Sequence, residues 1–157
     1  MSDEAYQMNI TGLEKIIKAF KGRQPYIRIG ILGSKNYRSK SIGQSNASIG
    51  ALHEFGSEKM PMRSFLRVPL SENLNKRIES SGALDKDVLA DVVKQGTIVP
   101  WLKKIAVLAE GIVAEAFETG GFSKWPPWKT PGYKNEGGRI LVDTGQLRDS
   151  ITSDIKE

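Results

Sequence analysis

The segment Asp143-Thr144-Gly145 has the form of the aspartic-protease signature, in which two such segments bring two carboxylates together to share one proton. The apolar residues 140–142 precede it. A homodimer would supply the second aspartate, but only twelve residues follow Gly145, too few for the remaining strands of such a half-site. We therefore expect a structural role, in which Asp143 or Thr144 caps the following helix and Gly145 permits the bend.

The pair His53-Glu54 is the other candidate for acid–base chemistry, because an ionised neighbour raises the pKa of a histidine. Adjacent residues on a helix face different ways, and no serine or lysine is spaced to act as its nucleophile, so a structural histidine is favoured. The chain has one histidine and no cysteine, which excludes thiol nucleophiles, disulfide scaffolds and the usual zinc or iron sites. The sequence predicts no enzymatic activity, no cofactor and no metal.

Residues 120–138 contain three of the seven prolines and five of the sixteen glycines, so no regular element is expected there. Their glycine spacing matches neither a dinucleotide-binding nor a phosphate-binding loop. The segment nevertheless holds Trp125 and Trp128, two of the three tryptophans. Aromatic side chains in an irregular segment usually anchor it or dock it onto another surface.

The net charge of +5 is concentrated in the first half of the 157 residues. Residues 1–67 carry 11 Lys or Arg against 5 Asp or Glu, whereas residues 68–157 carry 12 against 13. A basic half attracts polyanions through a sequence-independent term that weakens with salt. The alternative is a solvated surface that merely keeps the protein soluble.

The elements that must position these residues follow from hydrophobic spacing. Residues 25–33 alternate as a strand with an isoleucine face, and residues 47–55 have the spacing of a short helix that ends at Gly56. Residues 70–95 are expected to be helical with an interruption at Gly82. The segment from Thr97 to about Glu118 is the strongest predicted helix, with apolar residues at steps of 4, 3, 4, 3 and 4.

These elements predict one α+β domain over residues 1–157, with a small antiparallel or mixed sheet packed against a long helix and long loops. The polar stretch near 34–46 is interpreted as a mobile loop. No apolar run approaches the length of a membrane span, and the N-terminus is acidic where a signal peptide is basic and then apolar, so no membrane association is expected.

Three blocks together resemble the virion-morphogenesis or tail-completion (neck) proteins of tailed bacteriophages. The first block is Ala51-Leu-His-Glu-Phe-Gly56 followed by Met60-Pro-Met-Arg-Ser-Phe-Leu-Arg67. The second is Trp125-Pro-Pro-Trp-Lys129, and the third is Ile140-Leu-Val-Asp-Thr-Gly-Gln-Leu-Arg-Asp-Ser-Ile151. In this comparison His53, Glu54, Phe55 and Gly56, and likewise Asp143, Thr144 and Gly145, are structural motifs.

The resemblance implies an α+β fold, no catalysis and a homo-oligomeric ring at the head–tail interface or the tail end, a hexamer or alternatively a dodecamer. It implies neighbouring neck, connector or tail-tube proteins as partners, genomic DNA in the lumen, and a location in the virion after assembly in the bacterial cytoplasm. Members often continue past the third block with another strand or hairpin, whereas this sequence ends at Glu157, so the completion of the sheet stays open.

We expect five side chains to form or support the subunit contacts: Arg63, Phe65, Arg67, Trp125 and Trp128. We expect Lys35, Arg38 and Lys40 to face the DNA in the lumen or an acidic partner ring. The alternative function is a stand-alone basic nucleic-acid-binding protein, although no known DNA- or RNA-reading motif is present.

Overall fold

The computed structural model describes residues 14, 17, 18, 21, 22, 24–37, 43–127, 140, 141 and 145–157. Its elements, in chain order, are β1 (Tyr26–Ile31), the 3-10 helix η1 (Gly33–Asn36), α2 (Asn46–Phe55), α3 (Arg67–Ser80), α4 (Lys86–Gln95), α5 (Val99–Thr119), α6 (Gln146–Asp149) and β2 (Ile151–Lys156). The expected α+β fold, with a small antiparallel sheet against a long helix, is confirmed.

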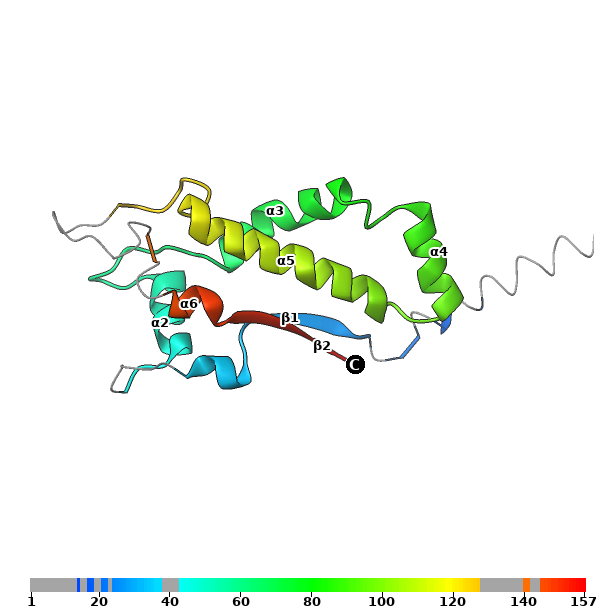
Figure 1. The fold of residues 1–157 in the computed structure, drawn as a ribbon, viewed down its shortest axis with the longest axis horizontal. Coiled ribbons are helices and arrows are strands. Elements are labelled where there is room, and N and C mark those ends of the chain that lie inside the picture. The colour runs from blue at the N-terminus through cyan, green and yellow to red at the C-terminus, as the bar shows by residue number, and fades with distance from the viewer. Residues whose placement is uncertain are drawn as a thin grey trace, which may run out of the picture.

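Helix α5 is the centre of the fold, and it lies between α3 on one side and the two strands on the other (Figure 1). The predicted apolar seam is the buried side of the helix: Leu102, Ile105, Ala109, Ile112 and Ala116. Pro100 lies in the first turn, where its missing N–H has no intrahelical partner, and Gly120 ends the helix in a left-handed conformation. The small residues of the seam are therefore used in packing within the chain itself.

Strand β1 pairs antiparallel with β2, with Ile31 opposite Ile151 and Tyr26 opposite Lys156. Ile29 and Ile31 pack against the core, as the alternation predicts. The sequence pattern does not predict the second strand. Residues Ile151–Lys156 thus form the strand that pairs with β1, and they complete the two-stranded sheet.

The face of the sheet opposite the isoleucines is polar and carries an ion pair between facing residues of the two strands. Arg28 Nε and Nη2 donate to the Asp154 carboxylate at 2.8 and 2.5 Å. The hydrogen bonds from Arg28 lower the pKa of Asp154 to about 2. This bidentate pair joins facing residues of the two strands and is consistent with the register of the backbone pairing.

Helices α2 and α6 pack together at one end of the molecule, and α4 lies at the other end beside the start of α5 (Figure 1). Helix α3 begins at Arg67, three residues before the predicted start, because Pro69 is tolerated in a first turn. The predicted interruption at Gly82 is confirmed, since residues 81–85 separate α3 from α4. Within the described residues, no helix combines the length and apolarity that a membrane crossing needs.

The stretch interpreted as a mobile loop is structured at both ends. It begins in the 3-10 helix η1, and the side-chain amide of Asn46 donates to the carbonyl oxygens of Lys35 and Tyr37 at 2.9 and 3.0 Å. The Asn36 side chain accepts from the Ala47 N–H at 2.8 Å. These bonds hold residues 33–37 against the start of α2, which corrects the expectation there, and residues 38–42 lie outside the described residues.

Candidate functional site

The carboxylate of Glu54 is buried and caps the start of α3. It accepts hydrogen bonds from the backbone N–H groups of Phe65, Leu66 and Arg67 at 3.0–3.1 Å and from the Ser64 hydroxyl at 2.6 Å. These N–H groups have no intrahelical partner, and the helix dipole favours a negative charge at this point. Glu54 is thus committed to joining α2 to α3, and the structural interpretation of the His53-Glu54 pair fits this geometry.

The guanidinium of Arg63 is also buried, with 2% of the residue exposed. Its Nε and Nη2 donate to the carbonyl oxygens of Pro126 and Pro127, each at 3.0 Å. Burial lowers the pKa of Arg63, although an arginine stays protonated. These two hydrogen bonds therefore hold the Trp-Pro-Pro segment against the stretch before α3, although the segment lies 63 residues further along the chain.

Aromatic packing joins the same two segments. The Trp125 indole N–H donates to the Ser64 carbonyl oxygen at 2.9 Å, and its ring meets Phe117 edge to face at 5.8 Å between centroids. The centroid of the Phe65 ring lies 5.1 Å from that of Phe117, with the two rings tilted by 38°. Leu147, from the third block, belongs to the same buried cluster. One buried junction thus contains residues from all three blocks.

This arrangement corrects part of the predicted interface. Phe65, Arg63 and Trp125 are each at most 9% exposed, so they do not present their side chains to another subunit. The three residues can still support a subunit contact by fixing the positions of neighbouring exposed residues. Trp128 lies outside the described residues.

Arg67 differs from these three because its side chain is exposed. Its guanidinium carbon lies 5.9 Å from the centroid of the Phe55 ring, which is itself 68% exposed. Arg67 Nε also lies 3.9 Å from a Glu54 oxygen. Sequence reasoning placed Phe55 in a structural motif, but the structure leaves its ring on the outside, beside an exposed cation.

The remaining candidate residues are only partly described. Lys35 is exposed on η1, whereas Arg38 and Lys40 lie outside the described residues. Asp143 and Thr144 also lie outside them. Gly145 precedes α6 with a φ of 74°, which agrees with the predicted bend.

Among the described residues, no group of three or more His, Asp or Glu side chains is arranged to hold a metal ion. Comparisons with protein-family models, curated proteins and solved structures found no match to this chain.

Proposed function

We propose that this chain is a structural protein of a tailed-phage virion. It acts as a ring subunit at the head–tail interface or the tail end, where it completes or terminates the tail and enables head–tail joining. The proposal rests on the resemblance of the three sequence blocks. The observation that carries it is that these blocks, far apart in sequence, meet in one buried junction built from Glu54, Phe65, Trp125 and Leu147.

The junction joins the three blocks through both polar and apolar contacts. Their polar members satisfy backbone groups and their apolar members fill the core. The junction is therefore a framework that sets the angle between α2, α3 and the Trp-Pro-Pro segment. A ring subunit needs such a rigid framework, because small errors in angle accumulate around a closed ring.

Large apolar side chains are exposed at separate places on the described surface, among them Phe55 on α2, Leu89 on α4 and Val107 on α5. Single exposed apolar residues are common on any protein surface, so on this proposal they are candidate contact points between subunits. On this proposal, Lys35, together with Arg38 and Lys40, faces the DNA in the lumen or an acidic neighbouring ring.

Deletion of the gene from the phage that encodes it tests this function. We expect DNA-filled heads and separate tails to accumulate in the lysate, and infectivity to return when the chain is supplied from a plasmid. Electron microscopy of the lysate gives the result directly. Normal joined particles without the chain would refute the proposal, and salt-sensitive binding of the free protein to duplex DNA would then favour the nucleic-acid-binding alternative.

A further inference from the structure

The chain leaves α5 through a turn whose backbone is left-handed over four consecutive residues. Gly120, Gly121, Phe122 and Ser123 have φ values of 64°, 67°, 57° and 65°. Glycine adopts such angles freely, but for other residues the left-handed conformation costs free energy, and it normally occurs at single positions. Backbone strain of this kind is typical of segments that change conformation, so the turn is a candidate hinge.

Hydrogen bonds within the turn offset part of this strain. The Ser123 N–H donates to the Thr119 carbonyl oxygen, and the Trp125 N–H donates to the Gly120 carbonyl oxygen, each at 3.0 Å. The Phe122 N–H donates to the Thr119 hydroxyl oxygen at 3.0 Å. Opening the turn exchanges these bonds for bonds to water, which is a modest net change per bond. The strain at Phe122 and Ser123, in contrast, is removed once their φ values become negative.

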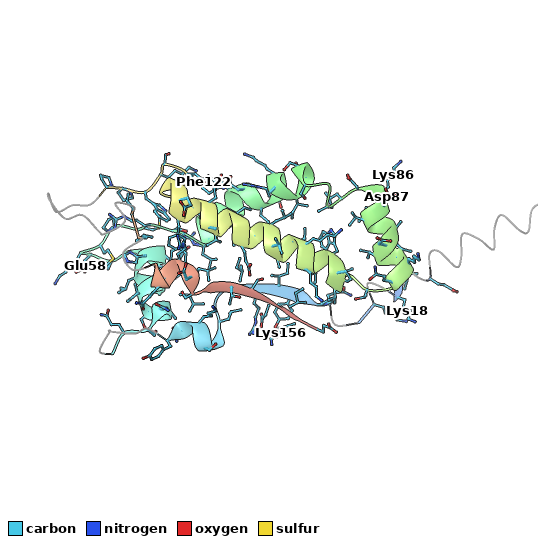
Figure 2. All side chains as sticks on the ribbon, in the orientation of Figure 1. Lys18, Glu58, Lys86, Asp87, Phe122 and Lys156 are labelled. Atoms are coloured by element: carbon cyan, nitrogen blue, oxygen red, sulfur yellow. The ribbon has the colours of Figure 1, made fainter. Side chains whose placement is uncertain are left out.

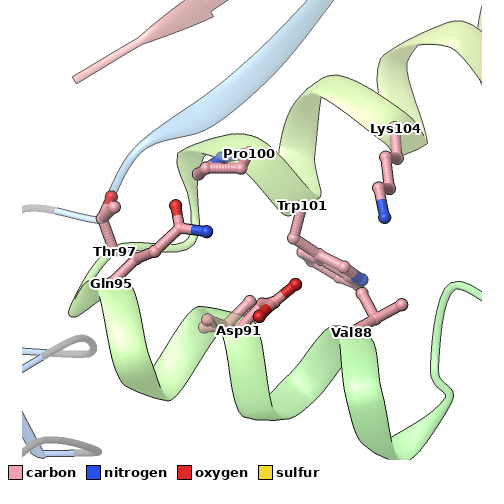
Figure 3. Close-up of a pocket in the computed structure, with 8 residues that line it drawn as sticks. Val88, Asp91, Gln95, Thr97, Pro100, Trp101 and Lys104 are labelled. Atoms are coloured by element: carbon pink, nitrogen blue, oxygen red, sulfur yellow. The ribbon is translucent and has the colours of Figure 1, made fainter.

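The part of the chain before the hinge has packing contacts of its own. Trp101 of α5 donates its indole N–H to the Ala83 carbonyl oxygen at 2.9 Å, and Figure 3 shows its ring directed toward Val88 on α4. Helix α3 packs along α5, and an ion pair between Arg77 and Glu115 at 2.5 Å joins the two helices. These three helices can therefore stay in place while the hinge opens.

The part of the chain after the hinge has its binding site on the part before it. Trp125 donates its indole N–H to the Ser64 carbonyl oxygen, Leu147 of α6 fills the buried cluster, and β2 pairs with β1, which packs on α5. Figure 2 shows this part reaching from Phe122 at the end of α5 to Lys156 on β2. Each of these contacts joins a residue before the hinge to a residue after it, so the same contacts can form between two copies.

We propose that neighbouring copies in the ring exchange the part of the chain after the hinge, so that each copy docks this part on the next copy. The inference rests on the proposed ring function and states how the copies are joined. Each docking contact within the chain is replaced by the same contact between copies, while the strained turn opens. Strained hinges favour such an exchange, because the open hinge no longer carries the strain. Successive exchanges close into a ring when the last copy docks on the first.

A pair of cysteines across the two strands reports the exchange directly, because the chain has no cysteine of its own. Tyr26 and Lys156 face each other in the register of β1 and β2, and both are exposed. Facing residues of antiparallel strands are about 4.5–5.5 Å apart between Cα atoms, a separation that a disulfide can span. Tyr26→Cys/Lys156→Cys therefore forms a disulfide within one chain before exchange and between two chains after it.

Particles of the encoding phage that carry this double variant give the first readout. After oxidation we expect a ladder of covalent oligomers larger than a dimer on a non-reducing gel. The matched control is Tyr26→Cys/Glu58→Cys, which should stay monomeric because Glu58 lies well away from Lys156, the residue that faces Tyr26 (Figure 2). Disulfides confined to single chains, or covalent dimers alone, would overturn the proposal.

Two substitutions at the exposed Ser123 should shift the exchange in opposite directions. Ser123→Pro fixes φ at about −65° and forbids the turn, so the purified protein, refolded at high concentration, should be recovered mainly as exchanged oligomers. Ser123→Gly relieves the strain of the closed turn and should lower the ratio of exchanged to unexchanged chains by about 5- to 30-fold. Ser123→Ala keeps the strain and should behave as wild type.

Size-exclusion chromatography of these variants in the double-cysteine background, followed by a non-reducing gel, measures both effects. A Ser123→Pro protein that folds as a monomer with an internal disulfide would overturn the proposal. If the proline variant does not fold, the comparison of Ser123→Gly with Ser123→Ala decides. Equal proportions of interchain disulfides in these two variants would also overturn the exchange.

Failure of this inference is distinguishable from failure of the proposed function. If the ring forms but every disulfide lies within one chain, the exchange is wrong while the ring function stands. If phage particles join normally without the chain, the function itself fails, whatever the gels show.

Discussion

Removal of the Glu54 carboxylate should unfold the junction between α2 and α3. In Glu54→Ala, the buried Phe65 N–H and Ser64 hydroxyl lose their acceptor, as do two partly buried N–H groups at the start of α3. A buried donor left unsatisfied costs about 1–3 kcal/mol. Allowing for partial solvation of the other two, we expect the free energy of unfolding to fall by about 3–5 kcal/mol, a large part of the stability of a typical domain.

Glu54→Gln refines the same prediction. The amide oxygen can accept at most two of the four hydrogen bonds, and the amide N–H₂ group then faces backbone donors. We expect this variant to lose about half as much stability as Glu54→Ala. The matched control is Glu58→Gln, an exposed carboxylate close by in sequence, which should stay within about 0.5 kcal/mol of wild type.

Urea denaturation followed by circular dichroism measures all three variants, with the midpoint and slope read separately. A Glu54→Ala protein within about 1 kcal/mol of wild type, at an unchanged slope, would refute the capping role. The control also guards against a general effect of net charge, because Glu54→Gln and Glu58→Gln change it equally.

The remaining predictions concern the aromatic segment and the sheet. Gly121→Ala should destabilise the fold by about 2–4 kcal/mol in urea denaturation, because a Cβ there would overlap the Trp125 indole and φ is +67°. Arg63→Lys should release the Trp-Pro-Pro segment, seen as faster proteolytic cleavage within residues 120–138, since one ammonium cannot reproduce the two-pronged contact with both proline carbonyls. The pKa of Asp154 lies below its ordinary value, so its pair with Arg28 contributes stability above about pH 4 that is lost as pH falls toward 2; a carboxyl NMR titration midpoint near 4 would contradict this.

The long helix and the first strand were predictable because their signals are local. The apolar steps of α5 identify both its period and its buried side, and Gly120 marks its end. The isoleucine alternation of β1 likewise identifies the face that turns toward the core. Each of these features depends on neighbours within one or two turns of chain.

Strand β2 was not predictable in the same way. It spans six residues, Ile151–Lys156, and it exists through pairing with β1 more than a hundred residues earlier. The facing charges of Arg28 and Asp154 could have suggested this register, but only once the two segments were already known to be neighbours.

In the candidate site, too, local signals were readable from the sequence and roles that depend on distant contacts were not. The sequence blocks were recognisable, yet their spacing did not reveal that Glu54 caps α3, because that role depends on where α3 starts. Arg63, Phe65 and Trp125 are expected to form or support a contact surface, since aromatic and arginine side chains are common there. Their burial rules out direct contact with another subunit and leaves the supporting role. The apolar residues of α4 are visible in the sequence, but only the tertiary structure shows that Val92 is buried while Leu89 stays exposed.

Electron cryomicroscopy of intact particles from the encoding phage tests the central claim most directly. The account predicts a closed ring of copies of this chain at the neck or the tail end. Particles in which this chain occupies no ring, or in which no copy is present at all, would contradict it.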